Sequence, residues 1–163
     1  MAAFLRRIRR VSDGSYRVRL PAQEREFLEQ LSPQLRELLN DPSADGDPAL
    51  GRLFPPAYSK EEDASRNAEY GRLMRDDLRE HHLAALAVLE ETAKATRLDE
   101  EQLSAWMGAL NVLRLVLGTR LDVTEEMFES DIADDDPRAP ALALYGYLSM
   151  LQAEVIDALS GGG

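Results

Sequence analysis

The two histidines of this sequence, His81 and His82, are the side chains best placed to begin a metal site, because imidazole is the commonest metal ligand in proteins. Adjacent residues on a helix point about 100° apart, so one helix face cannot present both rings to a single ion. Asp77 precedes His81 by four residues and could share an ion with it, but we can place no further ligand beside this pair. We therefore interpret both histidines as surface or structural residues and expect no metal and no cofactor.

Nucleophilic and redox chemistry finds equally little support. The chain has no cysteine, which excludes a thiol nucleophile, a thiolate-bound metal and a thiol redox switch within it. It contains no G-x-G-x-x-G, P-loop, G-x-S-x-G or H-E-x-x-H motif. The acidic run Glu129–Asp136 lacks the central glycine and the closing glutamate of a calcium loop, so we interpret it as a solvated, helix-capping segment, with a docking patch for basic partners as the alternative. We expect a protein that is not an enzyme.

Polar side chains interrupt the most apolar stretch of the chain, Leu110–Asp122. A buried guanidinium needs a carboxylate and further hydrogen bonds to offset its desolvation. We therefore expect a structural ion network here, and the alternative is a polar pocket that receives a ligand or a partner. The residues concerned are Asn111, Arg114, Arg120 and Asp122.

Charge is distributed unevenly along the 163 residues, whose net charge is −11. Residues 1–20 hold six arginines and one aspartate, a net charge of +5, and residues 21–163 hold 13 basic and 29 acidic residues, a net charge of −16. A basic arm can contact nucleic acid or an acidic protein surface, but the acidic body repels duplex phosphates. We expect the arm to bind a partner, with a solvated face as the alternative; it consists of Arg6, Arg7, Arg9, Arg10, Arg17 and Arg19.

These arginines lie on two predicted strands, residues 4–10 and 16–20, in which apolar and basic residues alternate. Ser12–Ser15 has turn chemistry, and Gly14 can take a positive φ. An isolated hairpin is marginally stable, so it must pack against helices.

Helical periodicity and capping residues predict helices in most of the remaining chain. We expect the first helix to kink or restart at Ser32–Pro33, because proline removes a backbone donor, with Ser32 as a possible new cap. We expect the third helix to end at Gly118. The predicted helices run from Pro21 to about Asn40, from Lys60 to about Thr96, from Asp99 to Gly118, from Glu125 to Ser130 and from Asp136–Pro137 onwards. Capping boxes are predicted at Ser59/Glu62 and Asp99/Gln102. Between the first two helices we expect a polar loop at residues 41–51 and an extended connector at Leu53–Tyr58.

The fold class that follows is mainly α: a compact bundle of four to six helices with a short N-terminal β-hairpin. The length favours one domain, with the basic hairpin at residues 1–20, the acidic bundle at 21–160 and a disordered tail at 161–163. The apolar stretches fall short of the ~20 residues that span a bilayer, and the N-terminal stretch lacks the apolar region of a signal peptide. We expect a cytoplasmic protein with no membrane partner.

Similarity to a known family rests on four stretches: Phe54–Tyr58, Asn67–Tyr70, Leu110–Glu126 and Tyr145–Gln152. They resemble an actinobacterial domain-of-unknown-function family, encoded beside the ClpS protease adaptor, and the likeness covers nearly the whole chain. The family is related to oxidative-stress transcriptional regulators of actinomycetes that sense oxidant through a cysteine pair and act with an alternative sigma factor. Because this chain has no cysteine, the resemblance implies a regulator without thiol sensing.

The leading hypothesis is therefore a non-enzymatic, transcription-related regulator that acts through a protein partner such as a sigma factor or RNA polymerase. One alternative is a direct DNA-binding module that uses the hairpin arginines. Another is a small-molecule-binding domain with a polar pocket near Asn111 and Arg114. A homodimer formed through the long helix or the last helix is left open.

Overall fold

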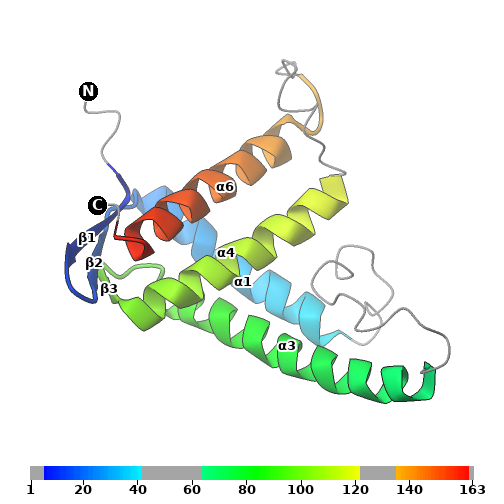
Figure 1. Cartoon of the computed structure of the whole chain (residues 1–163). Coiled ribbons are helices and arrows are strands. Elements are labelled where there is room, and N and C mark those ends of the chain that lie inside the picture. The colour runs from blue at the N-terminus through cyan, green and yellow to red at the C-terminus, as the bar shows by residue number, and fades with distance from the viewer. Residues whose placement is uncertain (1–5, 42–63, 122–134, 162–163) are drawn as a thin grey trace.

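The computed structural model describes residues 6–41, 64–121 and 135–161, which form four helices and three short strands (Figure 1). The predicted mainly helical fold with an N-terminal hairpin is confirmed. Along the chain the elements are β1 (Ile8–Ser12), β2 (Ser15–Val18), α1 (Ala22–Asn40), α3 (Ala64–Thr92), β3 (Arg97–Asp99), α4 (Glu100–Leu121) and α6 (Ala139–Leu159). Four predicted features lie outside the described residues: most of the polar loop, the connector Leu53–Tyr58, the Ser59/Glu62 capping box and the helix at 125–130.

The strands form one antiparallel sheet in the order β1-β2-β3, at the end of the bundle where α4 begins and α6 ends (Figure 1). Gly14 makes the predicted turn with a φ of 70°. The first strand lies later than expected and runs to Ser12. A strand needs a partner, and Ser12 pairs with Ser15, the first residue of β2. The third strand was not predicted, since three residues between two helices show no recognisable alternation.

The core is centred on α4, which packs against both α3 and α6. Trp106 is fully buried, and its indole Nε1 donates a 2.6 Å hydrogen bond to Thr92 Oγ1 at the end of α3. This helix contributes more residues to the core than any other described element: Leu103, Trp106, Ala109, Leu110, Val112, Leu113 and Val116.

Local sequence signals at the helix ends were partly right. The capping box of α4 forms as predicted: Gln102 N donates to Asp99 Oδ1 at 2.7 Å, and Asp99 N donates to Gln102 Oε1 at 2.9 Å. Pro21 stands just before α1 rather than inside it. Of the two outcomes predicted at Ser32–Pro33, the restart is wrong, because α1 runs on through Pro33 and Ser32 Oγ donates to the Leu28 carbonyl at 3.3 Å instead of capping a new helix.

Gly118 does not end α4, which continues to Leu121. The residue has a different reason to be glycine: a Cβ at this position would lie 2.9 Å from the Tyr145 ring on α6. Glycine thus allows close packing of the two helices. Within the described residues no helix has the length and apolar character needed to cross a bilayer.

Candidate interaction interface

The six arginines of the basic arm divide into two groups of three. In the first group, Arg6 forms an ion pair with Asp157 on α6, and Arg10 forms one with Asp13 at the hairpin turn. Arg7 is held most firmly of the three. These side chains fasten the hairpin to the body or to itself. The expectation that all six arginines bind a partner stays a prediction.

Arg7 lies where the hairpin meets α1 and α6. Its Nε and Nη2 donate to the two carboxylate oxygens of Glu24 at 2.8 and 3.3 Å, and its backbone N donates to Glu154 Oε1 at 2.8 Å. The hydrogen bonds that the Arg7 guanidinium donates to Glu24 raise the pKa of Arg7. The guanidinium carbon lies 5.9 Å from the centre of the Tyr147 ring, and burial, followed by the neighbouring Glu24, raises the pKa of Tyr147. Arg7 thus joins the hairpin to α1 and to α6.

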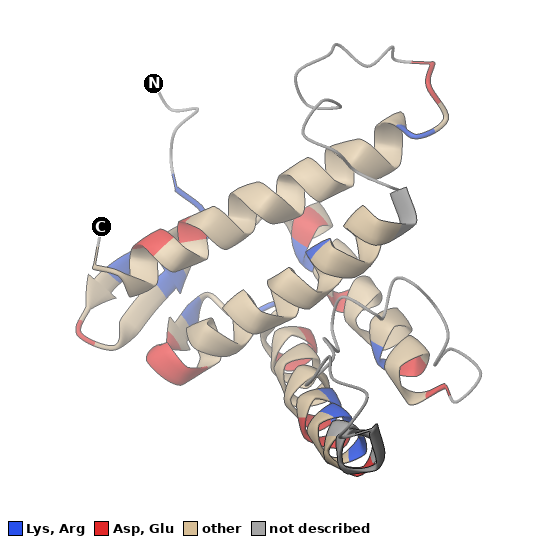
Figure 2. Ribbon diagram, turned by 45° about the vertical axis from the view of Figure 1, so that its right-hand side comes forward, with Lys and Arg blue, Asp and Glu red and all other residues tan. Residues whose placement is uncertain are grey.

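The second group, Arg9, Arg17 and Arg19, is different because none of the three forms an ion pair or a carboxylate hydrogen bond with a described residue. Arg9 pairs with Arg17 across β1 and β2, and Arg17 pairs with Arg97 across β2 and β3. The alternating neighbours Ile8, Tyr16, Val18 and Leu98 are buried in the core. The arginines therefore occupy the outer face of the sheet, and parts of the strands are blue in Figure 2.

We call Arg9, Arg17, Arg19 and Arg97 the arginine face. Directly opposed residues in a sheet have Cβ atoms about 5 Å apart, and like charges at that spacing destabilise the pairing. No described carboxylate neutralises the arginine face, so its charge is available to an anionic partner. Arg97 was missed from the sequence because it lies 78 positions after Arg19 and joins the others only through β3.

Arg25, which the sequence reading also missed, positions this sheet. Its guanidinium donates four hydrogen bonds to backbone carbonyls: Leu20 at 3.0 Å, Val18 at 3.0 Å, Ala93 at 3.0 Å and Ala95 at 2.7 Å. One side chain on α1 thus joins the end of β2 to the segment that leads from α3 into β3. No local signal distinguishes it from a solvated arginine in the first turn of a helix.

Of the four residues in the predicted polar group, the structure describes the side chains of Asn111 and Arg114. Asn111 Oδ1 accepts from Arg114 Nη2 and from Gln152 Nε2, each at 3.4 Å, and Arg114 Nε is buried without a hydrogen-bond partner. Arg114 has no carboxylate partner among the described residues. The side chain of Arg120 and the whole of Asp122 lie outside the description, so the proposed network with them stays a prediction.

The remaining candidate residues are the two histidines and the acidic run Glu129–Asp136. His81 and His82 stand edge to face with ring centres 6.1 Å apart, and the described part of the chain holds no group of three metal-ligating residues. Of the acidic run, Asp136 accepts from the backbone N of Arg138 at 2.8 Å just before α6, and its side-chain hydrogen bond with Arg138 lowers the pKa of Asp136. Residues 129–134 lie outside the description.

Comparison with known proteins identifies the family of this chain. Residues 3–159 match the family described as Domain of unknown function (DUF2017), so the chain belongs to that family. No curated protein and no solved structure matches it.

Proposed function

We propose that this chain is a non-enzymatic regulatory protein that acts by binding an acidic surface of a partner protein through the arginine face. The observation that supports the proposal most is the row Arg9, Arg17 and Arg97, which stands in register across three strands without a neutralising carboxylate among the described residues. A like-charge row costs stability. A partner that supplies carboxylates offsets this cost in the complex.

The transcription context of the proposal comes from the sequence resemblance. The resemblance points to an actinobacterial family with a ClpS-adaptor gene neighbour and a relation to oxidative-stress regulators, and hence to a sigma factor or RNA polymerase as partner. With no cysteine in the chain, the proposal places regulation in binding itself and assigns no thiol sensor.

Direct binding of DNA by the same arginines is the second candidate function. The arginine face forms no ion pair with a described residue, and this also suits phosphate contacts. The body of the chain argues against it, because residues 21–163 carry a net charge of −16 and repel a phosphate backbone. A protein partner can match the positive face alone, whereas a long duplex must also pass the acidic helices.

Affinity purification from the native host with a matched pair of variants tests the leading proposal. The double variant Arg17→Gln/Arg97→Gln removes two charges of the arginine face. The control Arg72→Gln/Arg75→Gln removes two exposed charges from α3. We expect the wild type and the control to recover the same transcription protein and the arginine-face variant to lose it. Repeated recovery of no transcription protein by the wild type, or equal recovery by both variants, contradicts the proposal.

Gel-shift titration at several salt concentrations separates the second candidate from the first. Binding through phosphates weakens steeply as salt rises, with a slope that reports the number of contacts. We expect no shift at physiological salt. A salt-steep shift that is lost in Arg17→Gln/Arg97→Gln would favour DNA over a protein partner.

A further inference from the structure

Two neighbouring hollows open between α1 and α6, on the body of the molecule rather than on the sheet. The first, of about 450 Å³, lies between the second half of α1, the end of α4 and α6. The second, of about 670 Å³, lies between the first half of α1 and the first half of α6. Leu144 lines both, so they form one groove, which we call the α1–α6 groove.

The groove exists because α1 and α6 are supported by different neighbours. α1 packs chiefly against α3, whereas α6 packs chiefly against α4 and touches β1. The two helices therefore stand apart, with the end of α4 between them (Figure 1).

Apolar side chains make up the floor of the groove. Several of them are only half-buried, and they line the same groove together instead of standing singly on the surface. The half-buried apolar residues of the lining are Phe27, Leu31, Leu38, Leu117 and Leu144.

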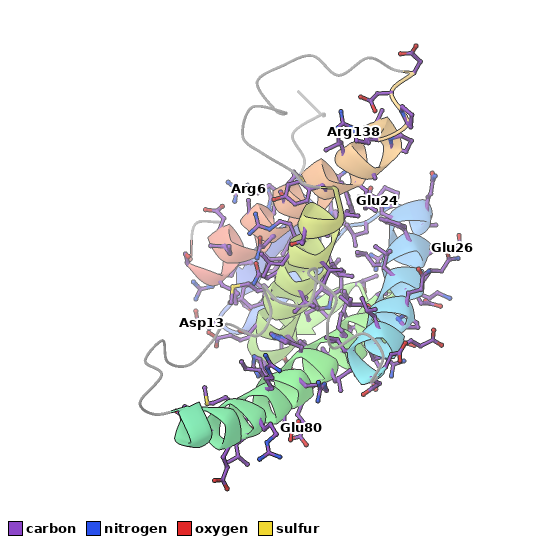
Figure 3. All side chains as sticks on the ribbon, turned by 90° about the vertical axis from the view of Figure 1, so that its right-hand side faces the viewer. Arg6, Asp13, Glu24, Glu26, Glu80 and Arg138 are labelled. Carbon is purple, nitrogen blue, oxygen red and sulfur yellow. The ribbon has the colours of Figure 1, made fainter. Side chains whose placement is uncertain are left out.

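The two walls of the groove differ in charge. The α1 wall carries Glu26 and Glu37, which are exposed and form no ion pair with a described residue. They are eleven positions apart, about three helical turns, and so project from nearly the same face of α1. Glu26 points away from the bundle in Figure 3. The α6 wall is formed by Pro140, Ala143 and Tyr147, none of which is charged at neutral pH.

A further polar group lies on the α6 wall. The Tyr147 hydroxyl is buried beside Glu24 and forms no hydrogen bond of normal distance and angle with a described residue.

We propose that the α1–α6 groove binds an amphipathic helix of a partner protein that carries lysine or arginine along one edge. α1 has 19 residues and is about 28 Å long, which suits a partner helix of about five turns. Apolar anchors one to two turns apart would fill the two hollows on either side of Leu144. Basic residues about eleven positions apart would face Glu26 and Glu37. A second copy of this chain suits the groove poorly, because its own helices carry an excess of carboxylates. This inference goes beyond the proposed function and does not depend on the arginine face.

The test is a selection from a random library of displayed helical peptides of about 18 residues, with the full chain as the immobilised target. We expect the enriched sequences to combine apolar residues at i, i+3 or i+4 and i+7 with lysine or arginine along one edge. Enrichment of acidic peptides, or of none, overturns the proposal.

Variants then locate the binding of an enriched peptide by fluorescence anisotropy. Ala143→Glu places a charge in the groove at an exposed position, and Ala153→Glu makes the same change at an exposed position of α6 that lines neither hollow. We expect at least a tenfold loss of affinity for the first, because a charge would be buried against apolar anchors, and less than about twofold for the second. Equal affinities for the two variants contradict the assignment.

The charged wall is tested by a second matched pair. Glu26→Gln/Glu37→Gln removes the two carboxylates of the groove, and Glu80→Gln/Glu91→Gln removes two exposed carboxylates of α3. We expect a threefold to tenfold loss for the first pair, in keeping with about 0.5 kcal/mol for each exposed ion pair, and little change for the second. An equal loss in both pairs would show general attraction to an acidic protein and overturn the proposal.

Discussion

Arg17 lies directly opposite Arg97 across the pairing of β2 with β3, and directly opposite Arg9 across the pairing of β2 with β1. Three guanidinium groups in one row are held in place by a sheet whose other face is buried in the core. A one-residue slip of register would move the buried side chains to the solvent. The core thus fixes the row in spite of its repulsion, and the same repulsion makes the row suited to bind carboxylates.

Removal of the central charge of the row should stabilise the isolated protein. We predict that Arg17→Gln raises the free energy of unfolding by about 0.5 kcal/mol at low salt, because it relieves two like-charge pairs. The gain should shrink as salt screens the repulsion. Urea unfolding at two ionic strengths measures it, and a loss of stability at low salt would contradict the picture of a repulsive row.

Arg25→Met should have the opposite effect. Four carbonyl acceptors lose a charged donor, and we predict a loss of at least about 2 kcal/mol in the free energy of unfolding. Arg72→Met on α3 serves as the control, because Arg72 is exposed and has no described partner. Equal stability of the two variants would show that Arg25 does not join the sheet to the helices.

The packing of α4 against α6 is tested at Gly118. We predict that Gly118→Ala lowers the free energy of unfolding by about 1–3 kcal/mol, since its Cβ would lie 2.9 Å from the Tyr145 ring. Gly146→Ala is the matched control: a Cβ there meets no atom within 4 Å, so the higher helix propensity of alanine should stabilise α6 by up to about 1 kcal/mol. Thermal melts of both variants check the prediction, which fails if Gly118→Ala is neutral.

Tyr147 should make the protein sensitive to alkaline pH. Its pKa is raised in the folded state by burial and by Glu24, so above the ordinary tyrosine pKa of about 10 the unfolded chain loses the proton first. The unfolded state then binds fewer protons than the folded one, and stability falls as the pH rises through that value. We predict that Tyr147→Phe flattens this fall in urea titrations between about pH 9 and 11, whereas Tyr70→Phe, at an exposed position, leaves it unchanged. An equally steep fall in Tyr147→Phe would contradict the assignment.

Sequence reasoning succeeded where the physics is local. The Asp99/Gln102 capping box and the Gly14 turn each depend on a few neighbouring residues, and both form. The buried stripe of α4 follows from periodicity alone. The mainly helical fold could therefore be predicted.

It failed where distant segments meet. Gly118 looks like a helix end until the ring of Tyr145 is placed beside it. Arg97 and Arg25 gain their roles only when β3 pairs with β2, which no window of sequence around either residue shows. The same reason explains why the ion pairs of Arg6 and Arg7 were not predicted. Their carboxylate partners lie on α6 and α1, far from the two arginines in the chain.

Site-specific photo-cross-linking in the native host tests the central claim most directly. A photoreactive residue in place of Val11, which is exposed on β1 two positions from Arg9, keeps every arginine in place. Ala84, exposed on α3, provides the control position. We predict that the probe at position 11 captures an acidic region of a transcription protein and that the probe at position 84 does not. Capture of nucleic acid alone at position 11, or the same protein captured from both positions, would contradict the account.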